Sequence, residues 1–144
     1  LDQGIFRNPA ALGLKTGDYR QRTFGMDMEY SRGHFGIFGE YVHNSWDTPR
    51  VVEGLDSNGF FIEPRYRIAP GITLAARWDQ VHFNDIASPL GSTPWEFDGS
   101  RVEAGLIYTV ERDLLLKATH QWNRSGSAVD PVDDVTLVQL ALSF

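Results

Sequence analysis

The sequence predicts an all-β protein, built as an antiparallel, up-and-down transmembrane β-barrel. Apolar and polar residues alternate with a period of two in seven segments, which is typical of half-buried strands. The connections between these segments are alternately short and long, and aromatic residues gather at the strand ends. No window has helical periodicity, and no apolar run approaches the ~18 residues that a membrane helix needs.

Length and composition exclude several other classes. The chain has 144 residues, which is about one domain. Hydrophobic residues make up 42% and charged residues 22%, so a disordered tail, a collagen and a coiled coil are excluded. The net charge of −6 argues against a nucleic-acid partner, which requires a basic face. With no cysteine, the chain has no disulfide framework and no thiol nucleophile.

The first two predicted strands form a hairpin. Phe24, Met26, Met28 and Tyr30 alternate with polar residues and glycine over 23–30. A turn at 31–34 leads to a second strand over 35–42. Its apolar parity holds Phe35, Ile37 and Tyr41, while its other parity mixes Gly36 and Glu40 with Phe38 and Val42.

The third and fourth strands, at 60–68 and 72–79, surround the tight turn 69–71. In such a hairpin, residues whose numbers sum to about 140 face each other, which places Glu63 opposite Arg77 and Arg67 opposite Thr73. Pro64 lies within the third strand, so we expect interrupted pairing there because proline lacks an N–H.

The last three strands are predicted at 101–110, 114–123 and 138–144. We expect residues 1–144 to form a single β-barrel region, in which 1–18 is a loop or weak strand and 19–144 is a meander of hairpins. The connections 44–58, 84–98 and 123–134 are expected to be long loops. They carry net charges of −2, −3 and −2, so the acidity of the chain gathers at one end of the sheet.

Alternation alone does not decide whether the apolar face points into a soluble core or toward lipid. The aromatic residues favour lipid, because they lie at strand ends in the manner of the two interfacial girdles of a membrane barrel. The predicted interface aromatics are Tyr30, Phe60, Tyr66, Trp78, Tyr108 and Trp122. Predicted strands of about 10–12 residues also suit a tilted membrane strand. A soluble eight-stranded barrel that binds an apolar ligand stays open as the alternative.

The end of the chain resembles the C-terminal signature of bacterial outer-membrane β-barrels, in which a terminal Phe follows alternating apolar residues. The residues that carry this resemblance are Val138, Leu140, Leu142 and Phe144. The hairpin from Phe60-Phe61-Ile62-Glu63-Pro64-Arg65-Tyr66 through Ala75-Ala76-Arg77-Trp78-Asp79 resembles those of phosphate-selective or general porins.

This resemblance implies a Gram-negative outer-membrane protein that carries small hydrophilic solutes or ions by passive diffusion. It also implies insertion by the barrel-assembly machinery through the residues Val138 to Phe144, contact with outer-membrane lipid and lipopolysaccharide, and a homotrimer as a candidate assembly. A small structural or adhesive outer-membrane barrel is a further alternative.

Topology predicts that the chain is part of a larger barrel. If Phe144 ends in the periplasm, the first of seven strands starts outside, whereas single-chain bacterial barrels have even strand numbers. We therefore expect the C-terminal portion of a barrel of about 16 strands.

A strip of charged residues lies on the parity opposite the apolar one and is the predicted pore lining. Its members are Glu63, Arg65, Arg67, Arg77, Asp79, Arg101, Glu103 and Lys117. Five cations against three anions predict a mild preference for anions. The competing interpretation is a wall of salt bridges in a narrow or plugged lumen.

We expect no cofactor, no metal and no catalysis. His34, His43, His82 and His120 lack metal-ligand spacing. Serine, histidine and aspartate are all present, but no GxSxG elbow or local constellation indicates a hydrolase.

Overall fold

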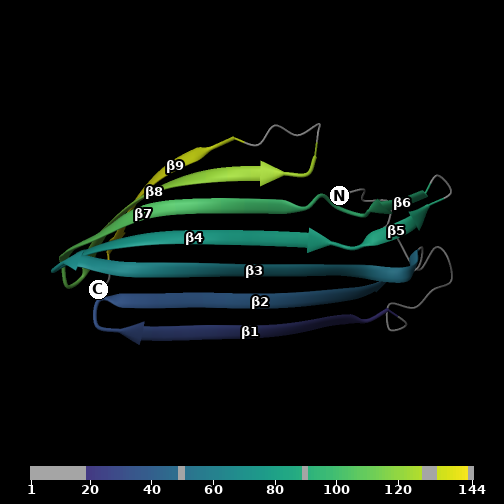
Figure 1. The fold of residues 1–144 in the computed structure, drawn as a ribbon, viewed down its shortest axis with the longest axis horizontal. Coiled ribbons are helices and arrows are strands. Elements are labelled where there is room, and N and C mark those ends of the chain that lie inside the picture. Colours follow the sequence, from purple (N-terminus) through teal and green to yellow (C-terminus); the bar gives the residue numbers. More distant parts are fainter. Residues whose placement is uncertain (1–18, 49–50, 89–90, 128–132, 143–144) are drawn as a thin grey trace.

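The computed structural model describes residues 19–48, 51–88, 91–127 and 133–142. Within these ranges seven strands form one antiparallel sheet in the order β1-β2-β3-β4-β7-β8-β9. The strands are β1 (Gln21–Arg32), β2 (Phe35–Thr48), β3 (Val51–Ala69), β4 (Ile72–Phe83), β7 (Gly99–Glu111), β8 (Leu114–Ser125) and β9 (Val135–Leu142). The predicted up-and-down meander of seven strands is thus confirmed, and Figure 1 shows each strand beside its neighbour in the chain.

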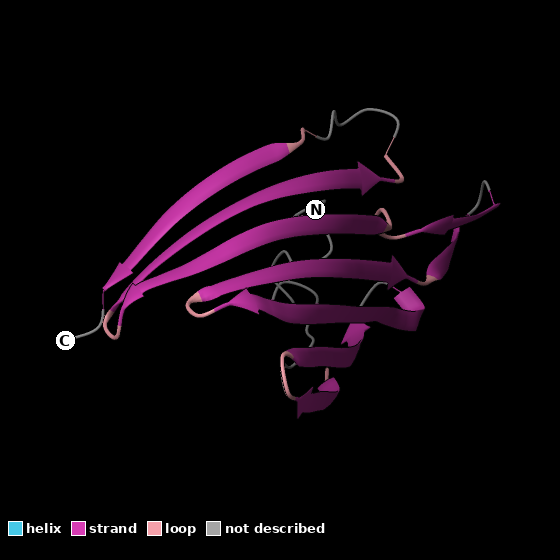
Figure 2. Ribbon diagram, turned by 60° about the vertical axis from the view of Figure 1, so that its left-hand side comes forward, coloured by secondary structure: helices cyan, strands magenta, loops and turns pink. Residues whose placement is uncertain are grey.

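The sheet is curved and does not close into a barrel. Figure 2 shows β7, β8 and β9 bending together away from β1 and β2. Among the described residues, β1 and β9 each pair along one side only. In this part of the chain, no helix is long and apolar enough to cross a membrane.

The alternation of side chains gives the sheet two different faces. We call them the charged face, which carries Glu63, Arg77 and Asp79, and the apolar face, which carries Phe60 and Trp78. On β4, Leu74 and Trp78 belong to the apolar face and are 47% and 44% exposed. The side chain of Asp79, on the charged face, is only 20% exposed. The sheet therefore exposes its apolar residues and partly buries its charges, which is the reverse of a soluble domain.

The register follows the prediction for the β3–β4 hairpin. The residue numbers sum to 140 in pairs such as Ile62–Trp78, Arg65–Ala75 and Arg67–Thr73. The pairing between β3 and β4 skips Glu63 and Pro64, because Pro64 has no N–H to donate to β4. Glu63 and Pro64 do pair with β2 on the other side of the strand.

Two of the predicted long loops are wrong in extent. Most of 44–58 is strand, because β2 and β3 continue to Thr48 and from Val51. Within 84–98, the short strands β5 (Asp85–Ser88) and β6 (Gly91–Pro94) form a separate hairpin, which projects beyond the end of β4 in Figure 1. Both segments are rich in turn-forming residues, yet ladder hydrogen bonds hold their backbones extended.

We call the end of the sheet that carries this hairpin the loop end. The opposite end, with the turns at 33–34, 70–71 and 112–113, is the turn end. The first two of these turns need glycine, since Gly33 and Gly71 have φ angles of 61° and 79°.

Candidate functional site: a charged wall on one face of the sheet

The structure brings the predicted pore-lining residues together on the charged face of four neighbouring strands. Cross-strand register places Arg77 beside Glu103, and Asp79 beside Arg101. We call the whole set the charged band; it comprises Glu63, Arg65 and Arg67 on β3, Arg77 and Asp79 on β4, Arg101 and Glu103 on β7, and Lys117 on β8.

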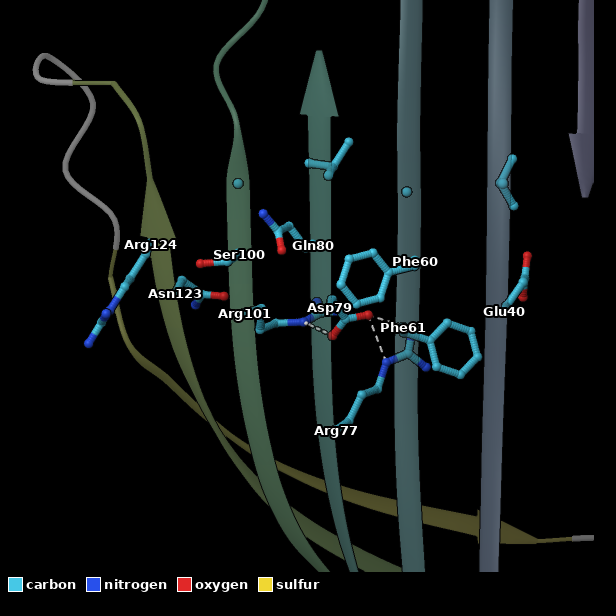
Figure 3. Close-up of a pocket in the computed structure, with 14 residues that line it drawn as sticks. Glu40, Phe60, Phe61, Arg77, Asp79, Gln80, Ser100, Arg101, Asn123 and Arg124 are labelled. Carbon is cyan, nitrogen blue, oxygen red and sulfur yellow. Dashed lines mark hydrogen bonds and ion pairs between the residues drawn. The ribbon is translucent and has the colours of Figure 1, made fainter. Parts of the chain in front are cut away.

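Asp79 is the central acceptor of the charged band. Its Oδ1 accepts hydrogen bonds from Arg77, at 2.8 Å from Nε and 2.7 Å from Nη2, and its Oδ2 accepts one from Arg101 Nε at 3.0 Å. A carboxylate between two guanidinium groups forms charge-assisted hydrogen bonds, which are the stronger kind. Figure 3 shows Asp79 between Arg77 and Arg101.

Two further carboxylates pair with the remaining cations. Glu63 accepts a hydrogen bond from Arg65 and lies 3.7 Å from Nη1 of Arg77. Glu103 lies 3.2 Å from Lys117 Nζ and also accepts a hydrogen bond from the side-chain amide of Gln121. Four of the five predicted cations therefore have a carboxylate partner. The side chain of Arg67 is exposed and forms no ion pair with the described residues.

Two phenylalanines also belong to this wall, and the sequence interpretation did not include them. The guanidinium of Arg77 stacks 3.7 Å from the ring centroid of Phe61, and that of Arg65 lies 4.4 Å from the ring centroid of Phe38. The signal was present in the sequence, because Phe61 is an apolar residue on the charged parity of its strand and Phe38 lies on the mixed parity of the second strand. The rings limit where the two guanidinium groups can lie.

An open hollow of about 600 Å³ lies over the charged face beside Asp79. It extends from the Arg77–Asp79–Arg101 group, labelled in Figure 3, toward the loop end. There Val42, Gly59, Val81 and Gly99 line it. Because glycine has no side chain, Gly59 and Gly99 leave room on the wall at this level. The part of the hollow nearer the turn end is therefore lined by charged residues, and the part nearer the loop end is lined by small residues.

The predicted interface aromatics are all exposed, between 36% and 52%. Register places Trp78 and Trp122 on either side of Val102, and Phe60 packs edge-on against Trp78 at 5.1 Å between ring centroids. Tyr66 and Tyr108 lie six residues closer to the turn end than Phe60 and Val102, about 20 Å along a strand. The aromatics thus lie at two separate levels along the strands, as in the two girdles of a membrane barrel.

The residues of the predicted assembly signal lie on edge strand β9. Val138, Leu140 and Leu142 are 73%, 61% and 66% exposed. Phe144 lies outside the described residues, as does the predicted loop or weak strand 1–18.

No group of three or more metal-ligating side chains occurs among the described residues. His120, on the apolar face, shares a hydrogen bond of 2.8 Å with Thr136 Oγ1 and packs edge-on against Trp122. His82 pairs with Asp98 at 2.6 Å, beyond the charged band at the loop end.

Comparison with known proteins identifies the fold but no family. No family model matches the sequence, and no curated protein matches it either. Two solved structures are similar, namely OmpT, an outer-membrane protein of Vibrio cholerae, and a variant of it that lacks loop L8. Their TM-scores are 0.60 and 0.61 at 19% and 18% identity, over 74% and 76% of this chain.

The chain spans about a third of the length of these structures, 32% and 34%. Its seven-stranded antiparallel meander is therefore similar to part of an outer-membrane β-barrel.

Proposed function

We propose that this chain is part of the wall of a Gram-negative outer-membrane porin, a non-enzymatic channel for small hydrophilic solutes or ions. The apolar face would contact lipid and lipopolysaccharide, and the charged face would line a water-filled lumen. The observation that carries the proposal is the reversed pattern of exposure, in which Trp78 is 44% exposed while the side chain of neighbouring Asp79 is 20% exposed. A lipid-facing surface with a polar interior is the arrangement of transmembrane barrels.

The charged band supports a conducting lumen, although its charges are largely paired. Fixed charges on a channel wall set the local potential and therefore the preference for cations or anions. The five cations and three anions of the band leave an excess of positive charge, which favours anions. Pairing weakens the field of the individual cations, because Arg65, Arg77, Arg101 and Lys117 each have a carboxylate partner.

The test is charge reversal in the intact protein, reconstituted in planar bilayers. Replacing Arg65, Arg67 and Arg77 with Glu should shift the reversal potential in a salt gradient toward cation preference. A matched control reverses Arg112, which lies in the turn 112–113 outside the strands, and should leave the potential near the wild-type value. A conducting triple variant with an unchanged reversal potential would show that the charged band does not line the pore.

The soluble-barrel alternative makes the opposite prediction about solvent. A soluble barrel would stay monodisperse in buffer, whereas a protein with the exposed apolar face described above needs detergent micelles. Size-exclusion chromatography with and without detergent separates the two.

A further inference from the structure

Trp95 lies over the charged face at the loop end of the sheet. Trp46 and Leu55 are a register pair on that face, and Phe83 pairs with Ser57 on the same parity. The ring of Trp95 packs edge-on against both aromatic rings, with centroid distances of 5.8 Å to Trp46 and 4.9 Å to Phe83. We call Trp46, Leu55, Phe83 and Trp95 the mouth cluster.

The burial pattern supports this placement. Leu55 is 1% exposed and is the one fully buried hydrophobic residue in the described part of the chain. Its neighbour Ser57 is only 5% exposed, although both lie near the open end of a single-layered sheet. Leu55 lies opposite Trp46 and Ser57 lies opposite Phe83, and the ring of Trp95 packs on both of these aromatic rings.

Hydrogen bonds hold Trp95 in place. Its indole N–H donates to the backbone carbonyl of Asp56 at 3.1 Å and to Oδ1 of Asn84 at 2.8 Å. Asn84 Oδ1 also accepts the backbone N–H of Asp56 at 2.7 Å, so one carboxamide joins the tryptophan to the end of β3. A large ring with a satisfied N–H is a rigid contact, because few of its torsions remain free.

A second attachment fixes the chain just after Trp95. The Asp98 carboxylate accepts the backbone N–H of Phe83 at 2.9 Å and pairs with His82, while the Asp98 carbonyl accepts the N–H of Gly126 at 2.8 Å. The segment 95–98 is thus attached to the ends of β3, β4 and β8. It is held as part of the wall.

The mouth cluster lies directly beyond the hollow. Phe83 is four residues from Asp79 along β4, about 13 Å nearer the loop end. Between the two levels, the wall carries the small residues Gly59 and Gly99. From the loop end inward, the charged face therefore presents bulky aromatic rings, then the hollow, then the charged band.

We propose that the mouth cluster is a fixed constriction at the outer entrance of the channel and that Trp95 determines the size of the solutes admitted. This rests on the proposed channel function. The cluster carries no charge, so it selects by size, whereas the charged band beneath it selects by charge.

The test compares Trp95→Ala with wild type in the intact protein, by single-channel conductance and by swelling of liposomes in sugars of increasing size. Removing the ring should raise conductance and shift the size limit to larger sugars, with no change of reversal potential. Trp78→Ala is the matched control, since it removes the same side chain from the apolar face and should change neither quantity.

Trp95→Phe tests the same point if the alanine variant does not assemble. A smaller ring should shift the size limit in the same direction by a smaller amount. A conducting variant of either kind with the wild-type conductance and size limit would overturn the constriction alone. Wild-type protein without conductance would overturn the channel, and the constriction with it.

Discussion

Gly105 shows how closely neighbouring strands fit on the charged face. It pairs with Thr119 across β7 and β8, and Thr119 is only 6% exposed. A Cβ placed on Gly105 would lie 2.5 Å from Thr119 Cγ2 and 3.1 Å from the carbonyl oxygen of Ala118. Threonine is β-branched and stiff at χ1, so it cannot simply swing away. The glycine is needed here for close approach.

We therefore expect Gly105→Ala to destabilise the barrel by about 1–3 kcal/mol, the usual cost of overpacking. The measurement is denaturant unfolding in detergent, followed by tryptophan fluorescence. Gly25→Ala is the control, because its Cβ would meet only Tyr41 O at an ordinary 3.9 Å. The double variant Gly105→Ala, Thr119→Ser should recover part of the loss, because it removes the methyl group in conflict. A double variant as unstable as the single one would contradict this explanation.

At the scale of elements, the β5–β6 hairpin depends on a titratable attachment. Desolvation acts to raise the pKa of Asp98, but the hydrogen bonds from the Phe83 N–H and His82 outweigh it, so this pKa lies below its ordinary value. A carboxyl whose pKa falls on folding stabilises the folded form above its unfolded pKa. That stabilisation is lost as the pH falls through the folded pKa.

We expect the segment 95–98 to loosen only below about pH 4, where an ordinary Asp titrates. Asp98→Asn should produce the loosened state at neutral pH, with a small effect because Asp98 is half exposed. Hydrogen exchange of the Phe83 and Gly126 amides measures it, and Asp85→Asn on β5 is the control. Equal exchange in Asp98→Asn and wild type at neutral pH would count against the attachment.

The sequence predicted the strands well where apolar and polar residues alternate strictly. The seven strands and the β3–β4 register follow from that pattern, and the interruption at Pro64 follows from the N–H that proline lacks. The strand prediction failed over 44–58, because strand residues outside the apolar band need not alternate. In addition, Asp56, Ser57 and Asn58 are residue types that are common in loops. The charged band could be assigned to one face from parity alone. The contact of Trp95 with Trp46 could not be predicted, because the two residues are far apart in the sequence and the segment around Trp95 has no periodic pattern.

At the scale of the whole molecule, the outer edges of β1 and β9, which no other described strand pairs, determine how the chain behaves. The free edges of β1 and β9 expose backbone N–H and C=O groups, which cost several kcal/mol each if left unsatisfied in hydrocarbon. We expect residues 19–142 alone, refolded in detergent, to associate through these edges and to give no compact monomer on size exclusion or heat-modifiable band on gels. A stable heat-modifiable monomer would instead mean that β1 pairs with β9.

The register described above also contains the geometry of the complete barrel. A line drawn across the sheet perpendicular to the strands passes through three hairpins, and its pairs are Arg32–Phe35, Tyr66–Leu74 and Leu106–Ala118. The first pair lies next to its turn, while the second and third lie about four and about six residues from theirs.

The turns thus step along the sheet by about two residues per hairpin, roughly 7 Å of strand for every 9.6 Å of sheet width. If the turns share one plane at the membrane surface, this stagger inclines the strands by about 36° to the membrane normal, within the 35–45° typical of membrane barrels. Summed over all strands, this stagger gives the shear of the barrel, and shear together with strand number determines the radius. Each added hairpin would therefore widen the barrel without changing the slope of its wall.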